Sequence, residues 1–152
     1  MEWLVLLHVL SAMLGLGPAY AFPLMMRNHA SAEQMKQTLD LVTRLEIFPK
    51  LFGTLAVVSG LLLFWVGSYG PFTQMWIIGS LAVYTVIEVI IIGFLQPAVK
   101  KWHQAFADSE QAAGTYSGTV SLSSLYARVR HLHLWACIVS LLLFALMVMK
   151  PQ

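Results

Sequence analysis

Four long apolar stretches constrain this chain more than any other feature of its sequence. They cover about residues 3–26, 47–66, 75–96 and 132–149. A helix needs roughly 20 mainly apolar residues to cross the hydrocarbon core of a bilayer. Charged residues make up only 11% of the 152 residues, whereas a soluble domain carries about 25%. We therefore predict one all-α domain, an integral membrane four-helix bundle with antiparallel neighbours, in contact with the lipid bilayer.

Basic residues are distributed unevenly between the connections. Most of the nine Lys and Arg residues lie between spans one and two or between spans three and four, and residues 67–74 contain none. The residues concerned are Arg27, Lys36, Arg44, Lys100, Lys101, Arg128 and Arg130. Short loops rich in Lys and Arg stay on the cytoplasmic side. This asymmetry predicts that both termini are outside, as for a multi-pass protein of a bacterial inner membrane.

The connections carry further structural signals. The stretch from Ser31 to Glu46 has apolar residues at helical spacing, which predicts an amphipathic helix on the inner membrane surface. Pro97 follows span three and should discourage its continuation, because proline lacks the backbone N–H that a helix needs. We expect residues 98–130 to form a loop with a soluble middle.

Composition also excludes several classes of protein. Cys137 is the only cysteine, so the chain has no internal disulfide framework and no multi-cysteine metal site. The basic residues are explained by the membrane orientation, so we expect no nucleic-acid partner. The sequence is compatible with a homo-oligomer but does not establish one.

The first span has a histidine on a face of small residues. His8 shares this face with Gly15 and Ala19, at spacings of three and four residues. Small residues allow a second helix or a flat ligand to approach the backbone. His8 therefore either bonds a serine or carbonyl of another helix, or ligates a metal or haem iron, or reaches the membrane interface.

The third span has a polar stripe. Trp76, Ser80, Tyr84 and Glu88 are each four residues apart, and Glu88 lies roughly 20 Å into the span. A carboxyl group at that depth is either protonated or paired. Glu88 and Tyr84 are accordingly candidate catalytic residues for proton or electron transfer, and a neutral Glu88 bonded across the bundle is the structural alternative.

Depth divides these polar groups into two layers. Lys50, Glu88 and His133 fall toward the inside and predict a polar inner layer in which Glu88 contacts Lys50 or His133. His8 is within about two turns of the outer surface, nearer in depth to Tyr84. His8 and His133 are therefore too far apart to ligate one iron together.

Several sequence segments resemble a known family. They are Leu7-His8-Val9-Leu10, Gly15, residues 22–30, Arg44-Leu45, residues 54–60 and Met149-Lys150-Pro151. In these the chain resembles the bacterial four-helix membrane protoporphyrinogen oxidases, which bind haem b, and the related copper-resistance-type membrane domains. An uncharacterised sister family of bacterial membrane proteins is the interpretation that we favour.

This resemblance implies a cofactor and a chemistry. Haem b would be ligated by His8, with Gly15, Ala19 and Tyr84 around the ring. The protein would then be a haem-dependent oxidoreductase with a porphyrin or quinone-type electron partner. Two alternatives stay open: a small transporter whose proton or ion path is formed by Glu88, Tyr84, Lys50 and His133, and a structural accessory subunit without a cofactor.

Overall fold

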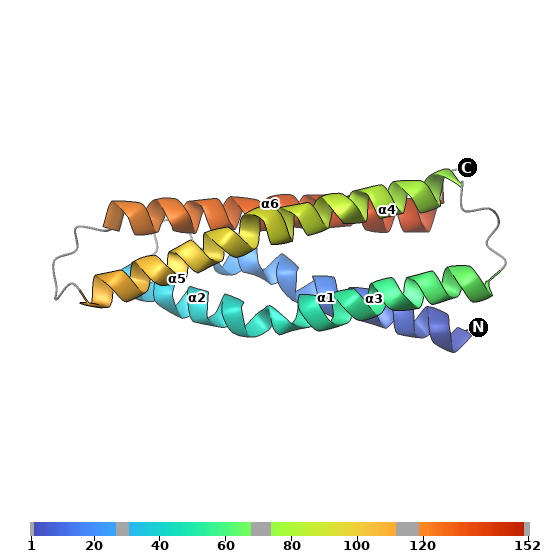
Figure 1. Cartoon of the computed structure of the whole chain (residues 1–152), viewed down its shortest axis with the longest axis horizontal. Helices are drawn as coiled ribbons and strands as arrows, with labels where there is room; N and C mark the ends of the chain where they lie inside the picture. The colour runs from blue at the N-terminus through green and yellow to red at the C-terminus, as the bar shows by residue number, and fades with distance from the viewer. Residues whose placement is uncertain (1, 27–30, 68–73, 112–118, 151–152) are drawn as a thin grey trace.

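A computed structural model describes residues 2–26, 31–67, 74–111 and 119–150, and all the secondary structure in these ranges is helical (Figure 1). The elements are α1 (Glu2–Met25), α2 (Ala32–Leu45), α3 (Ile47–Val66), α4 (Met75–Glu88), the π-helical segment η1 (Val89–Leu95), α5 (Gln96–Gln111) and α6 (Thr119–Met149). Four helical runs are long and apolar enough to cross a membrane: Glu2–Met25, Ala32–Val66, Met75–Asp108 and Leu122–Met149. The predicted all-α membrane fold is confirmed.

The four runs form two antiparallel pairs. Helix α1 packs along α3, and α4 packs along α6, while contacts between α1 and α6 hold the two pairs together. Helices α3 and α4 have no close backbone contact in the described ranges. The bundle is therefore open on the side between α3 and α4. The start of α1 and the end of α6 lie at the same end of the molecule (Figure 1).

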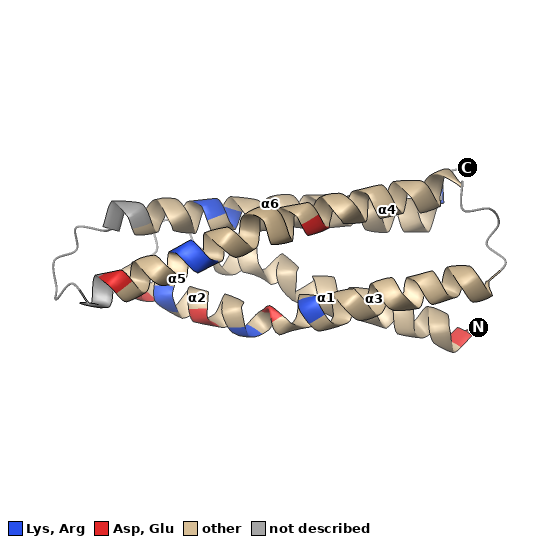
Figure 2. Cartoon of the chain, viewed as in Figure 1, with Lys and Arg blue, Asp and Glu red and all other residues tan. Residues whose placement is uncertain are grey.

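Three of the helical runs are longer than a bilayer requires. The run Met75–Asp108 has 34 residues, which corresponds to roughly 50 Å, whereas the hydrocarbon core is about 30 Å thick. The excess projects at the end opposite the termini, where most Lys and Arg residues gather (Figure 2). By the positive-inside rule we expect this end, called the inner end below, to face the cytoplasm.

The predicted amphipathic helix exists, but it does not lie flat on the membrane. A capping box begins α2: the Ser31 hydroxyl accepts from the Gln34 N–H, and the Gln34 side chain accepts from the Ser31 N–H. The apolar face of α2, with Met35, Leu39 and Val42, is buried in the protein. It contacts α5 and α6, so the expectation of a membrane-surface helix is wrong. The apolar side chains of α2 instead pack into a hydrophobic core of the protein that lies outside the spans.

Pro97 does not end the third span, and residues 98–130 are largely helical. Helix α5 includes Pro97 and continues to Gln111, and α6 begins at Thr119. In a regular α-helix the proline ring would meet the carbonyl group four residues back. Here η1 immediately precedes it, and the Gln96 N–H bonds the carbonyl of Ile91, five residues back. The wider π-turn accommodates the proline, so one helix passes from the membrane into the inner end.

The residues past the membrane have their own hydrophobic core, which we call the inner core. It combines large apolar side chains from α2, α5 and α6 with Met26 at the end of α1 and Leu95 of η1. Its fully or nearly fully buried members include Leu39, Trp102 and Val129. The described part of residues 98–130, which the sequence predicted as a loop, is therefore helical and packed into this core. The polar middle expected at residues 112–119 lies, except for Thr119, outside the described residues.

Candidate functional site

His8 lies in the interface between α1 and α3. Its Nδ1 is 2.8 Å from the carbonyl oxygen of Ala56 and 3.3 Å from Oγ of Ser59. A carbonyl oxygen can only accept, so Nδ1 carries the proton and donates it to Ala56. Nε2 then bears the lone pair, and it has no hydrogen-bond partner in the described part of the chain. The interhelical bond considered from the sequence is present, and the second ring nitrogen stays open for a ligand.

The backbone of α3 is shaped around the His8 ring. A Cβ atom on Gly60 would lie 2.9 Å from Cε1 of His8, closer than real side-chain contacts. Only glycine allows the imidazole to rest directly on the α3 backbone. The ring is therefore fixed both by a hydrogen bond and by the surface beneath it.

Gly15 and Ala19, the expected surroundings of a haem ring, lie against other helices. A Cβ atom on Gly15 would be 3.0 Å from the backbone nitrogen of Gly53. The Ala19 carbonyl receives a weak bond from the Cys137 thiol of α6 at 3.5 Å. Protein backbone and side chains thus occupy the space where the sequence suggested a flat ligand.

Tyr84 and Glu88 form a pair within one helix. The Tyr84 hydroxyl donates to Oε1 of Glu88 at 2.5 Å, and Glu88 is half-buried. Tyr84 is not brought near His8, because α1 and α4 have no close backbone contact over the described ranges. The outer layer expected from depth, His8 together with Tyr84, is therefore not assembled among the described residues.

The expected contact of Glu88 with Lys50 or His133 is not formed among the described residues. Lys50 pairs with Glu46 at 2.8 Å, and Nδ1 of His133 donates to the Val129 carbonyl one turn earlier in α6. The His133 ring also packs edge-on against Phe22 of α1 at 4.9 Å. Grouping these residues by depth therefore did not predict their contacts, because each finds a nearer partner.

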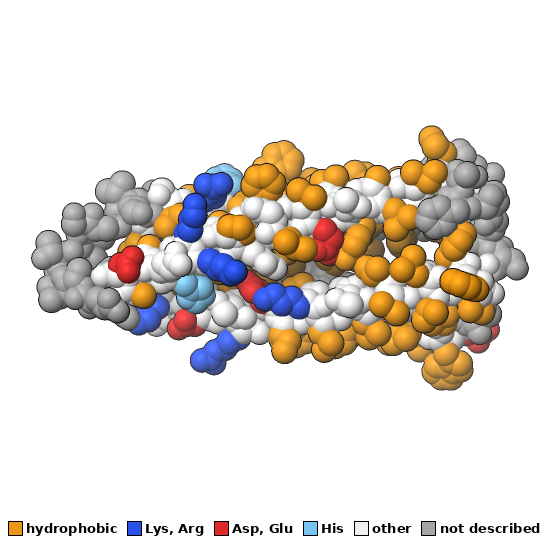
Figure 3. Space-filling view, in the orientation of Figure 1, with side chains coloured by type: hydrophobic (Ala, Val, Ile, Leu, Met, Phe, Trp, Pro, Cys, Tyr) orange, Lys and Arg blue, Asp and Glu red, His pale blue; other side chains and the backbone are white. Residues whose placement is uncertain are grey.

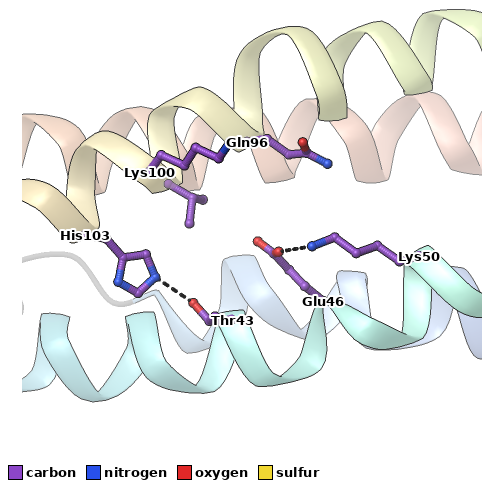
Figure 4. A pocket seen from close by; sticks show the side chains of 7 residues that line it. Thr43, Glu46, Lys50, Gln96, Lys100 and His103 are labelled. Carbon is purple, nitrogen blue, oxygen red and sulfur yellow. Dashed lines mark hydrogen bonds and ion pairs between the residues drawn. The ribbon is translucent and has the colours of Figure 1, made fainter.

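A cavity that sequence reasoning missed opens between α2, α3 and α5 at the inner end. We call it the inner cleft. Its polar lining residues are Thr43, Glu46, Lys50, Gln96, Lys100 and His103, with Val99 between them. The first three come from α2, α3 and the residue that joins them, and the others come from α5 (Figure 4). Its volume is about 190 Å³.

Two bonded pairs shape the inner cleft. Thr43 donates its hydroxyl hydrogen to the Leu39 carbonyl at 2.8 Å, so Nε2 of His103 must donate to the Thr43 oxygen at 2.9 Å. Lys50 compensates Glu46. Lys100 is exposed and has no ion-pair partner among the described residues. One uncompensated positive charge therefore borders the cleft.

Sequence reasoning missed this cleft because it ended the third span at Pro97. Gln96, Lys100 and His103 are spaced four and three residues apart, which places them on one helical face once α5 is continuous. That spacing was the available signal. The facing residues Thr43 and Glu46 depend on how α2 packs, which local sequence patterns do not specify.

The described ranges contain no cluster of three His, Cys, Asp or Glu side chains that could hold a bare metal ion. His8, with one open nitrogen, has the chemistry of a single axial ligand.

The fold and its intramembrane polar groups define a four-helix integral membrane protein with a helical core beyond the membrane. The chain belongs to the family described as "Predicted integral membrane protein (DUF2269)", whose model matches residues 2–151. Neither the curated proteins nor the solved structures include a match to this chain.

Proposed function

We propose that this protein binds haem b in the membrane through Nε2 of His8. The observation that carries the proposal is the state of the His8 ring: Nδ1 donates to Ala56, and Nε2 has no partner in the described residues. Metal-ligating histidines almost always donate their other ring N–H to a carbonyl or carboxylate. An open nitrogen in hydrocarbon, by contrast, is costly for a helix bundle.

The surroundings of His8 limit how a ring could be held. Gly15 contacts the α3 backbone, and Ala19 faces Cys137. Gly15 and Ala19 therefore fit a role in holding α1 against α3 and α6. A haem ring would instead contact residues near Nε2 of His8. Gly60 supports the imidazole from below. The resemblance of the first helix to haem-binding protoporphyrinogen oxidases supports the same ligand.

Bound haem would supply one-electron redox chemistry, with a porphyrin or quinone-type molecule as the electron partner. The contribution of this chain would be to fix the imidazole tautomer through Ala56 and to keep water away within the bilayer. We propose the bacterial inner membrane as the location, on the basis of the basic residues at the inner end.

An absorption spectrum tests the proposal directly. Protein purified after expression with ample haem should show a Soret band, and oxidised and reduced spectra should differ. His8→Ala should remove the band while circular dichroism and gel filtration still report a folded, monodisperse helical protein. His131→Ala is the matched control, because His131 is exposed on α6 and its loss should leave the band intact. A wild-type protein without a Soret band would end the haem proposal, and His8 would then be an interhelical bond.

The Tyr84–Glu88 pair favours a second candidate, proton or ion movement through the membrane. A phenol that donates to an intramembrane carboxyl group is typical of proton relays. Wild-type protein in liposomes with an entrapped pH-sensitive dye should then dissipate a pH gradient, and Glu88→Gln should abolish that flux. Equal leak rates for empty liposomes and wild-type liposomes would exclude this candidate without affecting the haem spectrum.

A further inference from the structure

The inner cleft lies where a lipid headgroup would lie. Lys50 is in the first turn of α3, and Gln96 follows η1 at the end of the predicted third span. The cleft is therefore at the level where apolar, membrane-spanning sequence gives way to charged sequence. Figure 3 shows orange apolar side chains on one side of this level and blue basic side chains on the other.

The cleft also lies on the open side of the bundle. In the described residues, α3 has no close backbone contact with α4 or α5, so no helix–helix contact closes the cleft along that side. Apolar residues next to the cleft are exposed, including Ile47 and Leu51 beside Lys50 and Ile92 one turn before Gln96. An amphiphile that entered from the bilayer could therefore place its head in the cleft and its chains against these side chains.

The charges of the cleft select for an anion. Glu46 is already paired with Lys50, so its charge is compensated inside the protein. Lys100 is an uncompensated cation in the described structure, and Gln96 offers amide N–H groups beside it (Figure 4). A phosphate group finds cationic and hydrogen-bonding partners here.

We propose that the inner cleft binds the phosphate headgroup of an anionic phospholipid from the cytoplasmic leaflet. Basic pockets between membrane helices on the cytoplasmic side suit such headgroups. Lys100 provides the main attraction, the Glu46–Lys50 pair forms the opposite wall, and the Thr43–His103 bond closes the far end. The proposal is independent of haem, because His8 does not line the cleft and contacts α3 further along, at Ala56 and Ser59.

Lipid retention tests this proposal. Wild-type protein is reconstituted into nanodiscs of equal parts phosphatidylglycerol and phosphatidylcholine, extracted into a neutral detergent, and analysed by native mass spectrometry. We expect at least one phosphatidylglycerol molecule to remain bound, in excess over phosphatidylcholine. Lys100→Gln should reduce that retention about fivefold, since one lysine near an anionic lipid contributes roughly this factor.

The neighbouring lysine provides a matched control. Lys101→Gln changes the net charge equally, but Lys101 does not line the cleft. It should leave phosphatidylglycerol retention unchanged, whereas an equal loss for both variants would mean general charge attraction and overturn the proposal. Retention of both lipids in equal amounts, or of neither, would also overturn it. A final arm adds inorganic phosphate in millimolar excess: binding of phosphate with no lipid retention would assign the cleft to a soluble anion instead.

Discussion

The membrane-spanning half and the inner end of this protein differ in which side chains they bury. In the spans, small or polar residues such as Ser11, Ser59 and Gly15 are buried beside a few larger apolar ones such as Phe22, while Trp65 is 89% exposed. In the inner core the largest side chains are buried, and Trp102 is 0% exposed. The sequence of each half reflects its solvent: lipid accepts apolar side chains, so burying them there brings no hydrophobic gain, whereas water strongly favours their burial.

The two halves are therefore stabilised by different forces. Close backbone contact and interhelical hydrogen bonds hold the spans together, as in the His8–Ala56 bond and the Tyr20–Ser140 bond at 2.7 Å. The inner core depends on the hydrophobic effect. The ring centroid of Trp102 lies 5.3 Å from that of Tyr126 and 6.3 Å from that of Phe106. Equivalent substitutions should consequently have very different costs in the two halves.

The largest effect is expected from Trp102→Ala. Removing a fully buried tryptophan from a water-exposed core costs about 3–5 kcal/mol. Thermal unfolding in detergent should show a large loss of stability, and limited proteolysis should cut the inner end faster. Trp65→Ala is the matched control and should change stability by less than about 0.5 kcal/mol, because Trp65 is exposed to lipid. Equal costs for the two tryptophans would contradict the comparison.

The next effect concerns the close contact of α1 with α3. Gly15→Ala inserts a Cβ 3.0 Å from the backbone nitrogen of Gly53, and a backbone cannot move aside as a flexible side chain can. We expect a cost of about 1–3 kcal/mol in the free energy of unfolding, measured by circular dichroism during heating in detergent. Gly17→Ala should be neutral or slightly stabilising, since nothing lies within 4 Å of its Cβ position. A harmless Gly15→Ala would show that the α1–α3 contact is looser than described.

A smaller effect is expected from the interhelical hydrogen bond of Tyr20. Ser140 donates to the Cys137 carbonyl, so the Tyr20 hydroxyl must donate to Ser140. A double-mutant cycle of Tyr20→Phe and Ser140→Ala should give a coupling energy of about 0.6 kcal/mol, the average for membrane hydrogen bonds. A coupling near zero would remove this bond from the forces that join α1 to α6.

The sequence was informative wherever one local pattern decides the structure. Apolar length predicted α3 at residues 47–66, which the structure matches as Ile47–Val66, and the spacing of Met35, Leu39 and Val42 predicted the buried face of α2. For the His8 face the sequence left a second helix and a flat ligand open, and the structure shows the contact with a second helix. These features depend on residues close together in the chain.

Some features that the sequence did not predict depend on partners far apart in the chain, and others on local geometry without a clear sequence pattern. The same spacing of apolar residues occurs in a helix that faces a membrane and in one that faces a protein core. The predicted position of α2 on the membrane surface was therefore wrong. Pro97 was read as a helix end, because the π-helical segment that accommodates it has no simple sequence signature. Glu88 was assigned to distant partners, although Tyr84, one turn away, was nearer. The inner cleft was missed because one of its walls depends on how α2 packs and the other depends on α5 continuing through Pro97.

The smallest effect should come from the pair at the boundary between the two halves. Glu46→Gln removes the 2.8 Å ion pair with Lys50, whose side chain is 61% exposed. An ion pair in contact with water contributes about 0–1 kcal/mol, and we expect the low end of that range. The residual effect should disappear in 1 M salt, where the screening length is about 3 Å. Heating in detergent at low and high salt measures both quantities, and Glu33→Gln at the start of α2 serves as a control for the loss of one surface carboxylate. A cost as large as that of Gly15→Ala would mean that the pair is shielded from water, and the boundary between lipid and water would then lie further into the inner end than the basic residues indicate.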